Sequence, residues 1–128
     1  MLKLEHIYKT FHGKPVLTDV NLEVAAGATR ALIGASGSGK TTLLRVTLGL
    51  IPFEKGYVKI NDQALLSFRH FEWADRIGYV PQDGGLFPHI SARQNIALVP
   101  KLRGWPKARI EARMAELRTL VGLEAADL

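Results

Sequence analysis

Residues Gly34–Thr41 read GASGSGKT and bring glycines, hydroxyl side chains and a lysine together in one short stretch. They fit the P-loop pattern G-x-x-x-x-G-K-[ST], whose backbone N–H groups cradle phosphate. Glycine lets successive N–H groups point inward, and the start of a following helix adds positive potential. In this pattern Lys40 reaches the outer phosphates, and the hydroxyl of Thr41 coordinates Mg²⁺.

The alternative is a glycine-rich turn that only joins a strand to a helix. Such a turn gains nothing from a lysine and a threonine placed directly after its last glycine, so the pattern favours a nucleoside triphosphate site. The nucleotide-binding residues that we predict in this loop are Gly34, Ser36, Gly37, Ser38, Gly39, Lys40, Thr41 and Thr42.

A P-loop needs a strand before it and a helix after it. The apolar run Ala31–Ile33 predicts a buried, parallel strand, and the leucine spacing in Lys40–Leu50 predicts a helix that stops near Gly49. Elsewhere the patterns predict a strand from Leu2 to Ile7, a loop over Lys9–Leu17, strands over Asp19–Val24 and Gly56–Asp62, a helix from Ser91 to Leu98, and a helix that begins at Pro106 and stops at Gly122. Strands that alternate with helices indicate an α/β fold.

The composition is that of a globular protein: 128 residues, 47% of them hydrophobic and 23% charged, without cysteine. The net charge is +5, but the 17 lysines and arginines are scattered along the chain. Without a dense basic cluster, we expect no nucleic-acid partner. Charged residues near Met1 and the short apolar runs predict neither a signal segment nor a membrane span.

Three segments together resemble the ATP-binding subunits of ABC transporters. They are FHGKPVLTDVNLEVAAGATRALIGASGSGKTTLL, VTLGLIPFEKGYVKIND and IGYVPQDGGLFPHISARQNIAL, and the likeness covers essentially the whole chain. The resemblance implies a P-loop NTPase fold of ABC type that binds ATP and Mg²⁺. It also implies a nucleotide-binding core over residues 1–82, followed by a Q-loop and the start of a helical subdomain over residues 83–128.

The same resemblance implies roles for residues outside the loop. Phe11 falls where the family places an aromatic ring that stacks on adenine; Tyr is common there, and on sequence alone a core position for Phe11 is an equal alternative. Gln82 matches the Q-loop glutamine, which ligates Mg²⁺ or positions the attacking water. The apolar segment after it faces the membrane subunit in the family, and its predicted interface residues are Leu86, Phe87 and His89.

The stretch GLFPHISARQNIALVPKLRGWPKARI resembles the subgroup for osmoprotectant and quaternary-amine uptake. The resemblance implies an importer ATPase on the cytoplasmic face of the membrane. Its partners would be a membrane-spanning permease, a second ATPase subunit and, indirectly, a substrate-binding protein.

The LSGGQ signature, the Walker B strand and the switch histidine of the family do not occur in these 128 residues. We therefore expect the chain to be truncated before the signature and inactive in hydrolysis alone, because no carboxylate polarises the attacking water. A non-catalytic nucleotide-binding module is the alternative from another class. A soluble ABC ATPase of DNA repair or translation is the reading that the sequence favours least.

Overall fold

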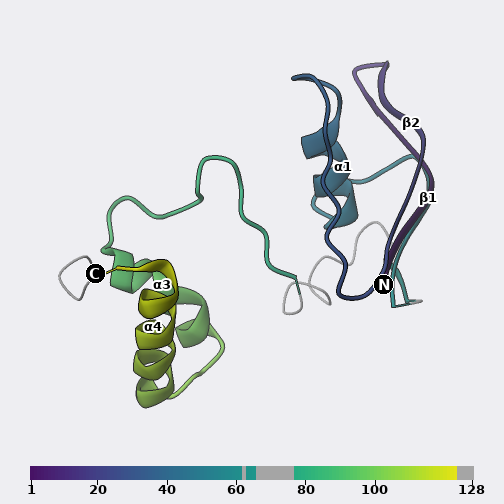
Figure 1. Ribbon diagram of the computed structural model, residues 1–128. Coiled ribbons are helices and arrows are strands. Elements are labelled where there is room, and N and C mark those ends of the chain that lie inside the picture. Colours follow the sequence, from purple (N-terminus) through teal and green to yellow (C-terminus); the bar gives the residue numbers. More distant parts are fainter. Residues whose placement is uncertain (62, 66–76, 124–128) are drawn as a thin grey trace. The chain divides into compact units, whose positions relative to one another are not determined.

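The computed structural model describes residues 1–61, 63–65 and 77–123, and the chain divides into two compact units, Met1–Gly78 and Tyr79–Leu128 (Figure 1). The described elements of the first unit are β1 (Leu2–Phe11), β2 (Lys14–Val24), α1 (Lys40–Thr47), β3 (Lys55–Ile60) and β4 (Gln63–Leu65). Those of the second unit are α3 (Ala92–Leu102) and α4 (Lys107–Val121).

The first unit is an antiparallel sheet in the order β2-β1-β3-β4, with α1 packed against it (Figure 1). Its core joins side chains from the sheet and from the helix, namely Leu4, Ile7, Leu17, Leu43, Val46 and Val58. Burial of this apolar cluster removes the helix face and the sheet face from water together. The helix that follows the P-loop is thereby fixed on the sheet.

A β-bulge interrupts the alternation of β1. Leu4 pairs with Leu22 and Ile7 with Val20, so two residues of β1 face the single residue Asn21 of β2. In a regular strand, side chains three positions apart point to opposite faces, yet Leu4 and Ile7 are both buried, at 1% and 0% exposed. The bulge therefore returns the apolar side chains of β1 to the core face.

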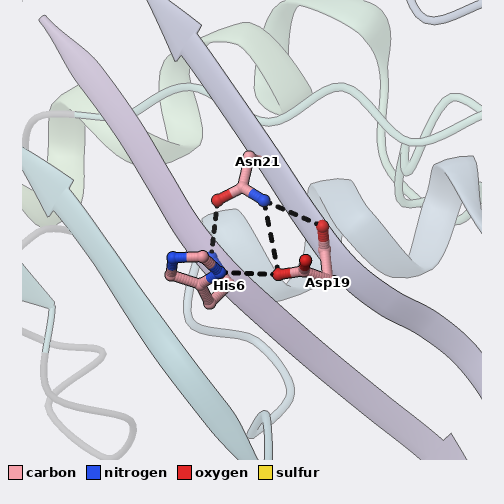
Figure 2. Close-up of polar contacts among 3 residues, drawn as sticks. All are labelled: His6, Asp19 and Asn21. Carbon is pink, nitrogen blue, oxygen red and sulfur yellow. Dashed lines mark hydrogen bonds and ion pairs between the residues drawn. The ribbon is translucent and has the colours of Figure 1, made fainter.

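Neighbours on both sides hold this bulge in place. On the β2 side, His6 N donates to Asn21 Oδ1 at 2.9 Å, and the His6 ring lies 2.6 Å from Asp19 Oδ1 (Figure 2). On the β3 side, a Cβ added to Gly56 would lie 2.4 Å from the carbonyl oxygens of both Glu5 and His6. Only glycine allows β3 to approach the bulged backbone so closely.

The second unit contains the helical hairpin α3–α4, whose buried residues are Ala97, Ile110 and Met114, with Trp105 packed against them. The Arg109 guanidinium lies 3.7 Å from the centroid of the Trp105 ring. Among the residues that the structure describes, no helix combines the length and apolar character of a membrane span.

Two predictions for the first unit were wrong. Ala31–Ile33 is not a strand, because no described strand pairs with it; Leu32 packs against the core, but Ile33 is 95% exposed. Lys9–Leu17 is not a loop but the end of the β1–β2 hairpin. His12 and Gly13 both have positive φ, so the turn takes only these two residues, and Pro15 is tolerated because β2 is an edge strand.

The three described helices lie where the sequence predicted them, but their bounds differ from the predicted ones. Helix α1 ends at Thr47 rather than Leu50, because Gly49 takes a left-handed φ and Leu50 N donates back to Arg45 O. Helix α3 begins after Ser91, as expected, but extends beyond Leu98 to Leu102 through Pro100. Pro106 is the N-cap of α4 rather than its first residue, and Gly122 ends that helix in a left-handed conformation, as predicted.

We expect Gly56→Ala to destabilise the first unit by about 2–4 kcal/mol, because the new Cβ clashes with backbone on both sides of the bulge and sits at an unfavourable φ. Urea unfolding of the chain measures the loss. Gly78→Ala is the matched control, since a Cβ there meets nothing within 4 Å. Equal, small effects of the two substitutions would contradict the packing role of Gly56.

The hydrogen bond between His6 and Asp19 at the bulge predicts a pH dependence. The hydrogen bond with His6 lowers the pKa of the Asp19 carboxyl below its ordinary value, with a smaller opposing effect of desolvation. A lowered folded-state pKa contributes stability above the unfolded pKa, and that contribution is lost as the pH falls through the folded value. We therefore expect Asp19→Asn to have a lower free energy of unfolding than the wild type at pH 6. Below the folded-state pKa of the Asp19 carboxyl, the two proteins should be equally stable.

Asparagine tolerates the positive φ of residue 19 as well as aspartate does, so this substitution adds no backbone strain. Denaturant titrations at a series of pH values test the difference. A stability gap that persists unchanged into strong acid would show that the carboxylate charge is not its cause.

Candidate functional site

The loop Gly34–Thr41 wraps around the amine of its own lysine. Lys40 Nζ donates to Gly34 O at 2.8 Å, to Ala35 O at 2.7 Å and to Ser38 Oγ at 3.3 Å. Ser38 N donates to Ala35 O, which closes a turn in the middle of the loop. The ammonium group is thus held at the first turn of α1, where the helix dipole is also positive, so cation and dipole together favour an anion such as phosphate.

Two glycines of this loop, Gly39 and Gly34, lie in close contact with their surroundings. Gly39 is the N-cap of α1 with φ +89°, and a Cβ there would lie 3.1 Å from Val16 O and 3.2 Å from Leu17 Cδ2. Gly34 lies so close to Ser38 that a Cβ would be 2.9 Å from its Oγ. The loop therefore packs directly on β2, and larger residues would separate it from the sheet.

The remaining predicted loop residues differ in their exposure to solvent. Ser36, Gly37, Ser38 and Thr41 are exposed, whereas Lys40 and Thr42 are half-buried. The exposed Thr41 hydroxyl, next in sequence to Lys40, is a ligand suited to a hydrated Mg²⁺ that is bound together with phosphate oxygens. The arrangement fits MgATP, the ligand that the sequence suggested.

Phe11 lies at the end of the β1–β2 hairpin, the same end of the first unit as the P-loop (Figure 1). Its side chain is 42% exposed, and it is not among the core residues. Two residues beyond its pairing partner Lys14, the backbone of Val16 meets Gly39 of the loop. An exposed ring is therefore placed on the strand pair that supports the loop Gly34–Thr41.

Gln82 belongs to the second unit, whereas the loop Gly34–Thr41 belongs to the first. Its side chain is exposed, and it lies within a turn that Gly84 N closes by donating to Pro81 O. The predicted interface residues follow it. Leu86 is 71% exposed and Phe87 47%, and the Phe87 and His89 rings meet edge to face at 5.9 Å.

Asn95 organises this exposed segment. Its Oδ1 accepts from Phe87 N at 2.8 Å, and its Nδ2 donates to the carbonyls of Phe87, Ile90 and Ser91 at 3.0–3.2 Å. Ser91 and Gln94 add a reciprocal capping box at the start of α3. One amide side chain on the helix thus fixes the backbone that presents Leu86 and Phe87.

Sequence reasoning missed Asn95, and it also missed Lys9 and Glu54, which pair beside Phe11 at 3.0 Å. An asparagine in the first turn after a serine N-cap is a signal that could have drawn attention to Asn95. The inward position of Lys9 had no such signal, because it depends on the bulge in β1.

The comparisons with known proteins agree with this geometry. A family model described as ABC transporter matches residues 17–127. The chain is 40% identical over 125 residues to a glycine betaine uptake system ATP-binding protein of Escherichia coli (strain K12), a match that covers 98% of the chain and 41% of that protein. It is 41% identical over 124 residues to a choline transport ATP-binding protein of Bacillus subtilis (strain 168), covering 96% of the chain and 32% of that protein.

An Fe(3+) ions import ATP-binding protein of Pectobacterium atrosepticum is similar to the same degree, 43% identical over 125 residues that cover 96% of the chain and 35% of that protein. The chain thus spans less than half the length of these relatives. Among solved structures, a dimeric ATP-binding cassette in a post-hydrolysis state, bound to ADP and Pi, matches with a TM-score of 0.85 at 28% identity, covering 99% of this chain and 60% of the other.

The family model covers most of the chain, including the loop Gly34–Thr41, Gln82 and the two helices described in the second unit. This chain belongs to the ABC transporter family.

Proposed function

We propose that this chain is the nucleotide-binding part of an ABC importer ATPase and that it binds MgATP at the loop Gly34–Thr42. The observation that carries the proposal is the Lys40 ammonium, held by three loop oxygens at the start of a helix that is packed on the sheet. In this role the loop N–H groups and Lys40 hold the phosphates, and Phe11 stacks on the adenine. The Thr41 hydroxyl and the Gln82 amide supply the ligands for Mg²⁺.

In the intact transporter, we propose three partners. A membrane-spanning permease contacts the exposed segment with Leu86, Phe87 and His89, and so holds the subunit on the cytoplasmic face of the membrane. A second ATPase subunit completes the nucleotide site, and a substrate-binding protein acts indirectly through the permease. ATP binding and hydrolysis then drive uptake.

For the transported solute we propose an osmoprotectant of the quaternary-amine class. The support is the likeness to relatives that are named for glycine betaine and choline uptake. Because a relative named for Fe(3+) import is equally similar, we assign the choice of solute to the partner proteins of the transporter.

The alternative role, a nucleotide-binding module without hydrolysis, differs in one measurable way. In our proposal, adding a full-length ATPase partner yields hydrolysis that Lys40→Ala abolishes.

Nucleotide binding predicts a stabilisation that depends on Lys40. A ligand that binds only the folded state adds RT ln(1 + [L]/Kd), or about 2.7 kcal/mol at a concentration 100 times Kd. We expect MgATP to raise the melting temperature of the wild-type chain by several degrees and to leave Lys40→Ala unchanged. Lys107→Ala removes the same charge from the second unit and should keep the full shift. Equal shifts in the wild type and Lys40→Ala would place ATP binding elsewhere.

The role of Asn95 predicts a local change. We expect Asn95→Asp to speed hydrogen exchange at the Phe87 amide by about tenfold, because a carboxylate cannot donate to the three carbonyls and repels them. The helix α3 should stay protected, since a negative charge near a helix N-terminus is favourable.

Ala92→Asp is the matched control, because it adds the same charge to the same helix end without replacing Asn95. Exchange measured by mass spectrometry over residues 83–91 reads the segment directly. If both variants leave this segment as protected as in the wild type, Asn95 does not order it.

A further inference from the structure

Lys9 is a charged side chain that the sheet buries. It is 9% exposed, and its Nζ lies 3.0 Å from Glu54 Oε1. The same Nζ lies 5.1 Å from the centroid of the Phe11 ring. A buried lysine is unfavourable unless it is paired, and an apolar residue would fill this position without that requirement. The pair therefore calls for an explanation other than packing.

Glu54 ties the end of β1 to the start of β3. Its Oε2 accepts from Thr10 N at 2.9 Å, and its own N donates to Tyr8 O at 2.9 Å. Desolvation opposes ionisation of this carboxyl, but the hydrogen bonds from Lys9 and Thr10 outweigh it and lower the pKa of Glu54. The carboxylate thus anchors both the ammonium of Lys9 and the backbone next to Phe11.

Residues before and after Phe11 in the sequence both restrict the position of its ring. On one side stands the Lys9 ammonium, and on the other is a two-residue turn, His12 and Gly13, with φ +49° and +76°. An ammonium over one face of an aromatic ring is attracted to its π electrons and restricts its rotamer. The ring remains 42% exposed, so surface is left for a flat apolar ligand.

We propose that Lys9, held by Glu54, positions the Phe11 ring for stacking on the nucleotide base. Lys9 and Glu54 are then positioning residues that set affinity for the adenosine part of ATP and leave the phosphate contacts unchanged. This inference rests on the proposed function, in which the P-loop binds the triphosphate and Phe11 stacks on adenine.

The test compares two ligands on the whole chain, MgATP and magnesium tripolyphosphate, which lacks the base and the sugar. Titration calorimetry gives both dissociation constants for each variant. We expect Lys9→Met to weaken ATP binding about five- to tenfold, with tripolyphosphate binding within twofold of the wild type. Lys9→Arg keeps a cation beside the ring and should restore most of the ATP affinity. Phe11→Ala should show at least the loss of Lys9→Met.

Lys55→Met is the matched control, because it removes an ammonium that lies 5.9 Å from another ring, that of Tyr8. It should leave both affinities unchanged. If Lys9→Met fails to fold, Glu54→Gln replaces it, since loss of the carboxylate charge releases Lys9 and should cause the same selective loss.

Equal weakening of both ligands by either variant, or no weakening of ATP binding, would overturn the positioning role. A wild-type chain that binds tripolyphosphate and ATP equally well would overturn it too, because the base would then add nothing. A wild-type chain that binds neither ligand would instead contradict the proposed function, and the positioning role would fall with it.

Discussion

The bulge in β1 is the constraint on which the first unit depends. Two residues of β1, Glu5 and His6, face a single residue on β2, and Gly56 on β3 has no side chain because the bulged backbone occupies that space. The inserted residue changes the face to which later side chains point. Ile7 therefore reaches the core, and Lys9 becomes a buried cation beside Phe11. Without the bulge, the same sequence would turn these side chains to the opposite face.

The proposed phosphate site is built on this strand pair. Leu17 of β2 pairs with Lys9, packs in the core and also meets Gly39 at the start of α1. Val46 on α1 is fully buried in the same core as Leu4 and Ile7. The position of the loop lysine is thus set by sheet packing on one side and by its own carbonyl partners on the other. A rigid support of this kind is what a site needs if it is to meet phosphate without rearrangement.

The local signals in the sequence were sufficient for much of this structure. The P-loop pattern, the helix after it, the Ser91 cap and the Gly122 stop are all decided within a few residues, and each was predicted.

The errors concern pairing between distant segments. Ala31–Ile33 has the composition of a buried strand, but a strand forms only beside a partner, and the described sheet offers it none. The hairpin around His12 looked like a loop because the left-handed φ of a non-glycine residue has only a weak sequence signal. Lys9 and Glu54 are far apart in sequence, so their pairing was visible only in the fold.

The central claim is that the loop Gly34–Thr42 is the nucleotide site of this chain. The most direct measurement is a two-dimensional ¹⁵N NMR titration of the whole chain with MgATP. The account predicts that the amide resonances of the loop and the first turn of α1 shift together with saturation, and that Phe11 shifts with them. Saturable shifts confined to other residues, or none at all on a chain whose spectrum is well dispersed, would contradict it.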